Sequence, residues 1–241
     1  MSEEKHYKGE FESVKFDYRR EAFGQYLNFL EEKNLPISEV LEHYSAYAGH
    51  MSINRLLTLY ELYKKVNNVA GHIAELGVYK GAGTLLFAKL VQIFEAESLT
   101  QVHGFDWFQG TTSGTEYDSD LVPEGGYQSS YEELIKLIEL QKLNHIVRIH
   151  NIDVRTELKG LFESYKHLQF KLVFMDAGRY DVMKEALPLF WERLTPGGIM
   201  VFDQFIHELG PAETLSVREY LPQIQIKTIP NSWMPNAYAV K

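Results

Sequence analysis

The stretch HIAELGVYKGAGTL, residues 72–85, decides the fold. It joins a short apolar run to a carboxylate, Glu75, then to a loop that carries Gly77, Gly81 and Gly83, and then to an amphipathic segment. A strand that ends in a glycine-rich turn and leads into a helix is typical of a nucleotide-cofactor site. The acid stands before the first glycine rather than about 20 residues after it, and the glycines are spaced Gly-x-x-x-Gly-x-Gly, so the dinucleotide pattern Gly-x-Gly-x-x-Gly is not met. The identity of the cofactor is therefore open at this point.

Composition limits the size of the core and the kind of partner. With 241 residues, of which 45% are hydrophobic, the chain has the size of one catalytic domain with an appendage. A formal net charge of -9 disfavours nucleic acid and anionic membranes as partners, so a small-molecule substrate is expected. The absence of cysteine excludes disulfides, thiolate metal sites and cysteine nucleophiles. The charged N-terminus contains no apolar signal core, and no run reaches the roughly 18 apolar residues of a membrane span, so the cytoplasm is the expected location.

The hydrophobic pattern changes near residue 71. Residues 1–70 are expected to form an N-terminal helical extension of the same domain, because apolar side chains recur there at helical spacing. Residues 71–241 are expected to form the catalytic domain. The expected strands cover 72–78, 101–108, 145–152, 170–176, 198–205, 224–229 and 237–241, and the expected helices cover 82–96, 130–143, 157–166 and 180–194. Such helices can connect parallel strands, so the predicted fold class is α/β, with a doubly wound, mostly parallel sheet of seven strands that ends in an antiparallel hairpin.

One connection is unusually long. Residues 109–128 are turn formers without periodicity and follow the second expected strand. Loops longer than about 12 to 15 residues in a compact domain are usually functional or disordered. This loop leaves the carboxyl end of a strand, where ligands of open α/β sheets bind. We therefore expect a substrate lid near residues 109–128, with a loop of no function as the alternative.

Carboxylates stand at the ends of most expected strands. Glu75, Asp106, Asp176 and Asp203 end four of them, and Asp153 follows a fifth. Any one of these acids could be a helix cap or a turn residue, but parallel strands bring their carboxyl ends to one edge, so the set favours a ligand site. A cofactor with an amino-acid head needs a partner for its ammonium group, and an adenosine needs an acceptor for its ribose hydroxyls. No Lys-Ser or Lys-Thr follows the glycines, which disfavours a P-loop NTPase.

Four segments carry a family resemblance. They are residues 74–84 (AELGVYKGAGT), 104–110 (GFDWFQG), 175–181 (MDAGRYD) and 194–204 (LTPGGIMVFDQ). In these segments the chain resembles class I S-adenosylmethionine-dependent methyltransferases, and among them the macrocin O-methyltransferase-like family of sugar O-methyltransferases. The lead-in at residues 50–55, HMSINR, is similar to the family's segment where a Met and an Arg approach the cofactor. The resemblance implies a Rossmann-like methyltransferase sheet that binds S-adenosylmethionine.

The resemblance also implies which residues contact the cofactor. In chain order these are Met51, Glu75, Gly77, Tyr79, Gly81, Gly83, Thr84, Asp106, Trp107, Asp153 and Asp176. Glu75 and the glycine turn would line the methionine end, and Asp106 would hold the ribose. Trp107 would flank the adenine and Asp153 would approach its amino group, although Trp107 could equally be a core aromatic and Asp153 a turn residue.

The sequence departs from the family at the metal site. Family members commonly show Asp-x-Asp-x-Tyr where residues 176–180 read Asp-Ala-Gly-Arg-Tyr, and Asp-Asp-Tyr where residues 203–205 read Asp-Gln-Phe. Two positions where the family has a carboxylate to hold a divalent cation are thus occupied by Gly178 and Gln204. Mg²⁺ prefers oxygen ligands. Asp176, Asp203 and the amide oxygen of Gln204 are therefore expected to form only a weakened Mg²⁺ site.

Methyl transfer to oxygen requires that the acceptor be aligned and lose its proton. Asp176 is the first candidate for the base or for a metal ligand, with Asp203 as its neighbour. His207, just beyond the strand that carries Asp203, is a second candidate for the base near neutral pH. The alternative is that His207 is a surface residue without a role in catalysis.

The expected acceptor is a hydroxyl group of a deoxyhexose, free or linked to a nucleotide. An anionic nucleotide-sugar would need local positive charge, for which Arg155, Arg179 and Lys184 are candidates. Three alternatives stay open, namely a small phenolic or catechol acceptor, a nicotinamide oxidoreductase, and a cofactor-binding module without catalysis. Aromatic and Met residues in the lead-in and the final hairpin favour a homo-oligomer, and the family resemblance points the same way.

Overall fold

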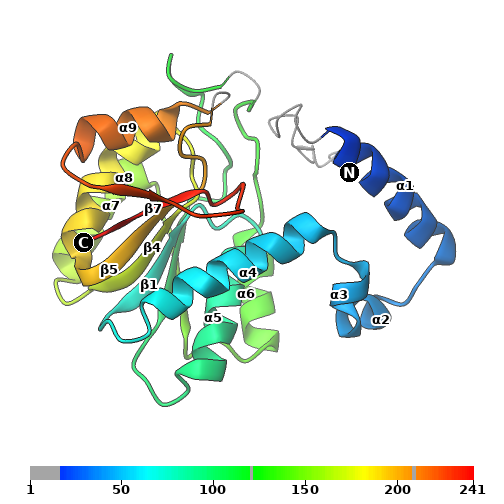
Figure 1. The fold of residues 1–241 in the computed structure, drawn as a ribbon. Helices are drawn as coiled ribbons and strands as arrows, with labels where there is room; N and C mark the ends of the chain where they lie inside the picture. The colour runs from blue at the N-terminus through cyan, green and yellow to red at the C-terminus, as the bar shows by residue number, and fades with distance from the viewer. Residues whose placement is uncertain (1–16, 120–121, 208–209) are drawn as a thin grey trace.

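The computed structural model describes residues 17–119, 122–207 and 210–241, and its centre is a seven-stranded sheet (Figure 1). The strands are β1 (His72–Leu76), β2 (Val102–Asp106), β3 (Val147–Asn151), β4 (Phe170–Met175), β5 (Leu194–Phe202), β6 (Ile226–Thr228) and β7 (Ala237–Val240). They are ordered β3-β2-β1-β4-β5-β7-β6. The first five are parallel, whereas β7 pairs antiparallel with both β5 and β6. The strand order reverses beside β1, which is where ligands of open α/β sheets bind.

Helices cover both faces of the sheet. They are α1 (Asp17–Lys33), α2 (Ile37–Glu42), α3 (Tyr44–Tyr47), α4 (His50–Lys65), α5 (Ala82–Phe94), α6 (Tyr131–Leu140), α7 (Val154–Ser164), α8 (Tyr180–Arg193) and α9 (Ala212–Tyr220). Side chains of α4, α5 and α6 share one core cluster with the sheet, and side chains of α7, α8 and α9 share a second cluster on the opposite face. The architecture is therefore a three-layer sandwich, as the sequence predicted.

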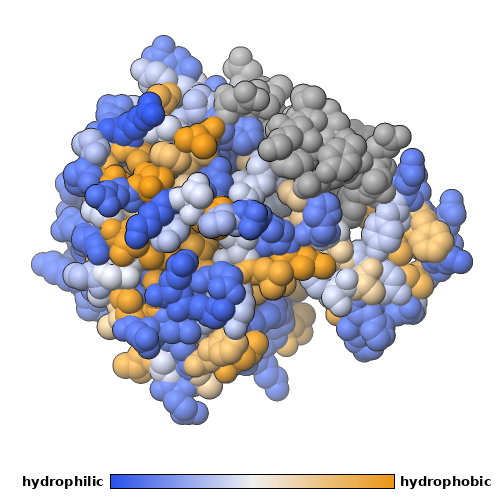
Figure 2. Space-filling view, in the orientation of Figure 1, coloured by the Kyte–Doolittle hydropathy of each residue, from blue (hydrophilic) through white to orange (hydrophobic). Residues whose placement is uncertain are grey.

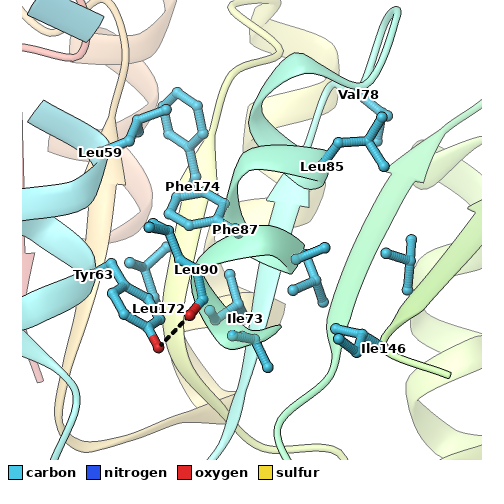
Figure 3. Packing of buried hydrophobic residues seen from close by; sticks show 14 of the residues in the cluster. Leu59, Tyr63, Ile73, Val78, Leu85, Phe87, Leu90, Ile146, Leu172 and Phe174 are labelled. Atoms are coloured by element: carbon cyan, nitrogen blue, oxygen red, sulfur yellow. Dashed lines mark hydrogen bonds between the residues drawn. The ribbon is translucent and has the colours of Figure 1, made fainter. Parts of the chain in front are cut away.

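Helix α4 is fastened to the sheet by its last two turns. Leu59 and Tyr63 pack beside Phe87 of α5 and Phe174 of β4, and the Tyr63 hydroxyl donates to the carbonyl oxygen of Leu90 (Figure 3). All four of the packed side chains are at most 2% exposed. Burying a side chain of this size contributes about 1.5–3 kcal/mol. Helix α4 is therefore a fixed element of the domain, and its first turns are held over the edge where β4 and β5 end.

The first three helices form an arm that extends away from the domain (Figure 1). The Tyr26 hydroxyl donates to the carbonyl oxygen of Tyr47, and the Tyr47 hydroxyl donates to Glu39, so the helices of the arm hold one another. Helices α2 and α3 contain no buried residue. The N-terminal extension is therefore helical from Asp17, and residues 1–16 lie outside the described part.

The predicted fold class is confirmed, and the largest differences concern β5, α7 and α9. Strand β5 covers Leu194–Phe202 rather than residues 198–205. Helix α7 begins at Val154, three residues earlier than expected, because Asp153 caps it. Helix α9 was not predicted. Its inward-facing positions include the buried polar residues Glu213 and Ser216, which interrupt the apolar spacing that identifies a helix. Within the described residues, no helix is both long and apolar enough to cross a membrane.

Two stacked histidines inside the sheet make stability depend on pH. The rings of His103 on β2 and His150 on β3 lie 5.3 Å apart, and their facing nitrogens are 3.0 Å apart. Burial lowers the pKa of His103 to about 3 and the pKa of His150 to about 4. Unfolding restores a pKa of about 6.5. The unfolded chain therefore binds more protons below about pH 6.5, and the free energy of unfolding falls as the pH falls toward 4.

We expect His150→Phe to reduce this dependence, because Phe keeps the stacking on Phe105 but cannot be protonated. Urea unfolding between pH 4.5 and 7.5 measures it. The exposed His145, changed to Gln, is the matched control and should leave the slope unaltered. An unchanged slope in His150→Phe would contradict the assignment.

Candidate active site

A cavity of about 500 Å³ opens at the carboxyl edge of the parallel strands. Its walls come from the glycine turn after β1, the ends of β2, β4 and β5, the start of α4, the loop after β2 and the connection between β6 and β7. Cavities of roughly 300–1,000 Å³ are typical of small-molecule sites. The strand-end acids that the sequence placed together do converge here, since Glu75, Asp106, Asp176 and Asp203 all line this cavity.

The glycine turn leaves no room for side chains. Gly77 and Gly81 have φ of +88° and +85°, which favours glycine. A Cβ on Gly77 would lie 2.3 Å from the carbonyl oxygen of Asp176, and a Cβ on Gly83 would lie 1.9 Å from Oε1 of Glu75. The turn therefore joins the ends of β1 and β4 closely and leaves the backbone bare toward the cavity.

Glu75 is the buried acid of the cofactor end. Its side chain is 2% exposed, and the hydroxyl of the fully buried Thr84 donates to its Oε2 atom. Burial raises the pKa of Glu75 to about 7. A carboxylate in this setting gains from a cationic ligand, which offsets the cost of burying its charge. Glu75 is therefore suited to the ammonium group of an amino-acid head, and its expected contact with the cofactor stays a prediction.

Asp106 organises the turn around that head. Its Oδ2 accepts from the backbone N–H groups of Val78 (2.8 Å) and Tyr79 (2.9 Å), and its Oδ1 accepts from that of Phe108 (2.8 Å). An ionised carboxylate offers about four acceptor positions. Three are taken by the loops, so there is room for one ligand hydroxyl, and the expected contact with a ribose stays a prediction.

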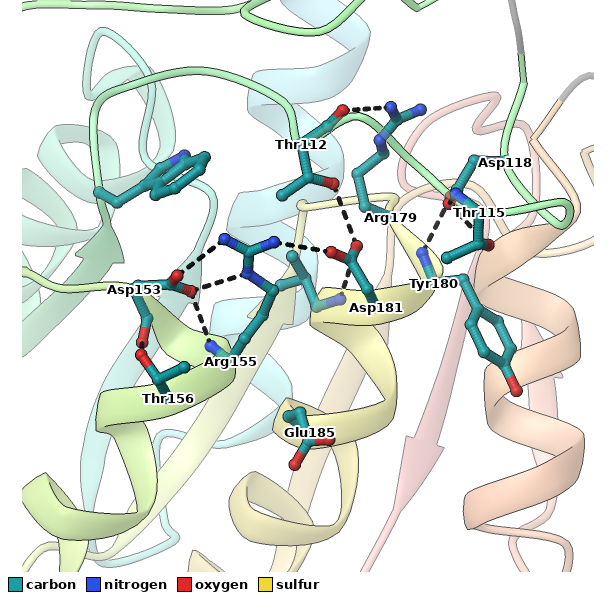
Figure 4. Close-up of polar contacts among 12 residues, drawn as sticks. Thr112, Thr115, Asp118, Asp153, Arg155, Thr156, Arg179, Tyr180, Asp181 and Glu185 are labelled. Atoms are coloured by element: carbon teal, nitrogen blue, oxygen red, sulfur yellow. Dashed lines mark hydrogen bonds and ion pairs between the residues drawn. The ribbon is translucent and has the colours of Figure 1, made fainter.

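Trp107 and Asp153 both lie at the expected adenine end of the cavity. The guanidinium of Arg155 lies 4.9 Å from the ring centre of Trp107. Arg155 also binds both carboxylate oxygens of Asp153, at 2.9 and 2.7 Å, and Asp153 caps α7 through the Arg155 N–H (Figure 4). Asp153 is therefore a helix cap in the cavity wall, and its contact with the adenine stays a prediction.

The acceptor end is built around one arginine. Arg55 of α4 donates from Nη1 to Oδ1 of Asp203 at 2.6 Å and from Nη2 to Oδ2 of Asp176 at 2.7 Å. Its guanidinium lies 5.2 Å from the ring centre of Phe174. Burial and the neighbouring Asp203 raise the pKa of Asp176 well above its ordinary value. Asp176 is therefore a better proton acceptor than an exposed aspartate, while Arg55 compensates the charge of both acids.

The expected Mg²⁺ ligands are not arranged around an open position. Arg55 already binds an oxygen of Asp176 and an oxygen of Asp203. Gly178 adds no ligand, and Oε1 of Gln204 lies 3.2 Å from the place that a Gly178 Cβ would take. Across the described ranges, no three His, Asp or Glu side chains form a group that could hold a metal ion. The donor set as arranged therefore does not fit a divalent cation.

A buried glutamate supports the Asp203 strand end and was not foreseen. Glu213 of α9 is fully buried, and its Oε1 accepts from the backbone N–H of Gln204 at 2.9 Å. Burial, and then Asp203, raise the pKa of Glu213 well above its ordinary value. A single acid in an unpredicted helix offered no sequence signal. His207, the second candidate for the base, is 9% exposed and contacts the Trp233 ring, but it does not line the cavity.

The loop after β2 is tied to the start of α8. The Arg179 guanidinium donates to the carbonyl oxygen of Thr112, and the Thr112 hydroxyl donates to Asp181 at 3.1 Å (Figure 4). Asp118 accepts from the backbone N–H of Tyr180 at 2.9 Å. These bonds hold the described part of the expected lid against the cavity wall.

Two of the three expected cations lie at the cavity. Arg155 and Arg179 line it, whereas Lys184 pairs with Glu185 at 3.9 Å outside it. Met51 lies in the wall as predicted, and so do Trp233 and Met234 from the connection between β6 and β7. The cavity therefore has an acidic floor, and on the side beneath the loop it has Arg179 together with an Arg155 that is paired with Asp153 and Asp181.

Comparisons with known proteins agree with this arrangement. The family described as a methyltransferase domain matches residues 74–205, more than half of the chain. Three solved structures share the fold. The crystal structure of CalS11, a calicheamicin methyltransferase, is 22% identical with a TM-score of 0.81, over 92% of this chain and 91% of that chain. The apo structure of CalS11, described as a TDP-rhamnose 3'-O-methyltransferase, is 23% identical with a TM-score of 0.74, over 92% and 93%.

The third structure is the O-methyltransferase NovP, which is 19% identical with a TM-score of 0.62, over 78% of this chain and 80% of that chain. No curated protein sequence gives a significant match. At these identities the likeness to solved structures establishes the fold, and the family match establishes the kind of domain.

We expect Gly83→Ala to weaken cofactor binding, because its Cβ would displace the Glu75 carboxylate. A lost hydrogen bond to a charged group costs about 1.5–3 kcal/mol, so the Kd for S-adenosylhomocysteine should rise about tenfold or more. Isothermal titration calorimetry measures the Kd. Gly160→Ala on α7 is the control, since nothing lies within 4 Å of its Cβ position. Equal affinity in both variants would show that Glu75 does not hold the ligand.

Proposed function

Because the chain belongs to the methyltransferase domain family, we propose that it transfers a methyl group from S-adenosylmethionine to a hydroxyl group of a sugar. The class I methyltransferase expected from the sequence is thereby confirmed, with S-adenosylmethionine as its cofactor. One observation carries the proposal. A single cavity joins the buried Glu75, suited to the cofactor's ammonium group, to the acid pair Asp176 and Asp203, suited to a hydroxyl acceptor.

The proposed acceptor is a deoxyhexose linked to a nucleotide. Support comes from CalS11, whose description names TDP-rhamnose as its substrate. Arg179 lines the side of the cavity beneath the loop after β2 and supplies positive charge for an anionic nucleotide, whereas Arg155 is already paired with Asp153 and Asp181. We propose that this loop is the substrate lid of the domain formed by residues 71–241, since its bonds to Arg179 and Asp181 close the cavity on that side.

The residues of the acceptor end perform a proton transfer and an alignment. When bound, the cofactor supplies an electrophilic methyl group on a sulfonium. Asp176 takes the proton of the sugar hydroxyl while the new oxygen–carbon bond forms and the sulfur–carbon bond breaks. Its raised pKa brings it closer to the operating pH, where a general base is most effective. Glu75 and the glycine turn would hold the methionine end of the cofactor in the same cavity that Asp176 and Asp203 line.

We expect Asp176→Asn to lower kcat by about 10²–10⁴-fold, the usual contribution of a general base. The measurement is transfer of labelled methyl groups to a panel of nucleotide-linked and free deoxyhexoses. The Kd for S-adenosylhomocysteine should stay within a few-fold of the wild-type value, which separates catalysis from binding. Glu185→Gln, at an exposed acid of α8 that does not line the cavity, is the control for a carboxylate outside the site. Unchanged turnover in Asp176→Asn would remove it as the base, and a wild-type protein that methylates phenols but no sugar would overturn the proposed acceptor.

We also propose that the chain assembles as a homo-oligomer through its helical arm. The arm exposes large apolar side chains, and Figure 2 shows orange patches among the blue surface there. The exposed apolar and aromatic side chains of the arm include Leu27, Phe29, Ile37, Leu41 and Tyr44, which are 40–78% exposed. Apolar and aromatic surface of this kind is typical of subunit interfaces.

Light scattering after size exclusion tests this proposal. We expect the wild-type protein to elute as an oligomer and the double variant Ile37→Glu with Leu41→Glu to shift to a smaller species, because charges are costly in an apolar interface. Leu99→Glu is the control, since Leu99 is 92% exposed in the loop before β2. A wild-type protein that is monomeric at all concentrations would refute it.

A further inference from the structure

Arg55 stands between two carboxylates that would otherwise be free to hold a divalent cation. We propose that Arg55 is a positioning residue that takes the place of this cation, so that the proposed methyl transfer proceeds without added metal. This proposal rests on the proposed function only for its kinetic test. Its structural basis is the pair of contacts that Arg55 makes with Asp176 and Asp203.

The geometry is that of a built-in cation. A guanidinium is planar, permanently charged, and presents its N–H groups as a fork. In this protein each terminal nitrogen is bound to a different carboxylate, at 2.7 Å for Asp176 and 2.6 Å for Asp203. The two acids belong to the ends of adjacent parallel strands, β4 and β5. One cation therefore joins two strand ends, which is the task that a bridging metal ion performs.

Arg55 is held in this position by its helix. It lies one helical turn before Leu59, whose side chain is 2% exposed in the core beneath α4. The Phe174 ring supports the guanidinium at 5.2 Å, within the range of a cation–π contact. The charge is consequently fixed by packing, unlike that of a flexible surface arginine.

The neighbouring positions 178 and 204 supply no carboxylate to replace the two that Arg55 occupies. Mg²⁺ requires near-octahedral oxygen coordination, commonly through carboxylates, substrate oxygens and water. Gly178, between the two acids' strand ends, has a φ of +64° and no side chain, and the third expected ligand, Gln204, is neutral. A cation at this place would have to break both ion pairs of Arg55 and leave the guanidinium without a partner, which is costly for a partly buried charge.

Arg55 affects the proposed reaction by holding Asp176 in position. Without a cation between them, Asp176 and Asp203 repel each other, and Asp176 loses the orientation in which it faces the acceptor. Misplacement of a reacting group by about 1 Å can cost 10²-fold in rate. Since Arg55 acts in this proposal through the two acids, its removal should lower kcat far more than it raises KM.

The first test measures metal binding and does not depend on the acceptor. Titration of Mn²⁺ into the wild-type protein, followed by electron paramagnetic resonance, should show no saturable site up to millimolar concentration. Arg55→Ala frees both carboxylates and should bind Mn²⁺, and Arg55→Ala with Asp203→Asn should lose that site again. A wild-type protein that binds Mn²⁺ through Asp176 and Asp203 would overturn the proposal.

The second test measures turnover with the acceptor that wild type uses. Wild-type kcat should change less than twofold between excess EDTA and added Mg²⁺, whereas Arg55→Ala should lose about 100-fold in kcat. Arg55→Lys keeps the charge but not the fork, and should recover part of the loss. Arg148→Ala on β3 is the control. A wild-type enzyme that EDTA inactivates and Mg²⁺ restores would refute the proposal, while failure to methylate any sugar would refute only the proposed function.

Discussion

The ion pairs from Arg55 to Asp176 and Asp203 are the interaction on which the site depends. A parallel sheet brings the carboxyl ends of its strands together, and here three acids meet there, since Glu75 lies close enough to influence the pKa values of Asp176 and of Arg55. Because these pairs are only partly buried, removing one partner should cost less than the about 3–5 kcal/mol typical of a fully buried pair. The docking of α4 through Leu59 is therefore a condition of the active site as well as part of the core.

Charge is divided across the cavity in a way that suits a cationic cofactor and an anionic acceptor. The floor carries Glu75, with its pKa raised to about 7 by burial, and the cofactor's positive groups compensate that burial when bound. On the side beneath the loop after β2, Arg155 is paired with Asp153 and Asp181, whereas Arg179 donates to a carbonyl oxygen. Arg179 is therefore the local positive charge that the proposed nucleotide-linked acceptor would meet on a chain with a net charge of -9.

The sequence predicted those features that depend on a local pattern of residues. All seven strands and the glycine turn were identified, because apolar runs and the spacing of Gly77, Gly81 and Gly83 are local signals. Helix α9 was missed because polar residues face inward, and the ion pairs of Arg55 were not foreseen because its partners lie 121 and 148 residues away. His207 was named as a base from its position after β5, and it packs against Trp233 of the cavity wall without lining the cavity itself.

Asp181 connects the two halves of the site. Its Oδ1 accepts from the Thr112 hydroxyl in the loop after β2, and its Oδ2 pairs with Arg155 at 3.0 Å. Arg155 in turn covers Trp107 at the adenine end. Arg155 and Thr112 therefore share one carboxylate, and because hydrogen bonds to charged groups are stronger than neutral ones, Asp181 links the adenine end of the cavity firmly to the loop after β2. Asp181 can make both contacts because it stands at the first turn of α8, two residues after Arg179, whose guanidinium donates to the carbonyl oxygen of the same Thr112 (Figure 4).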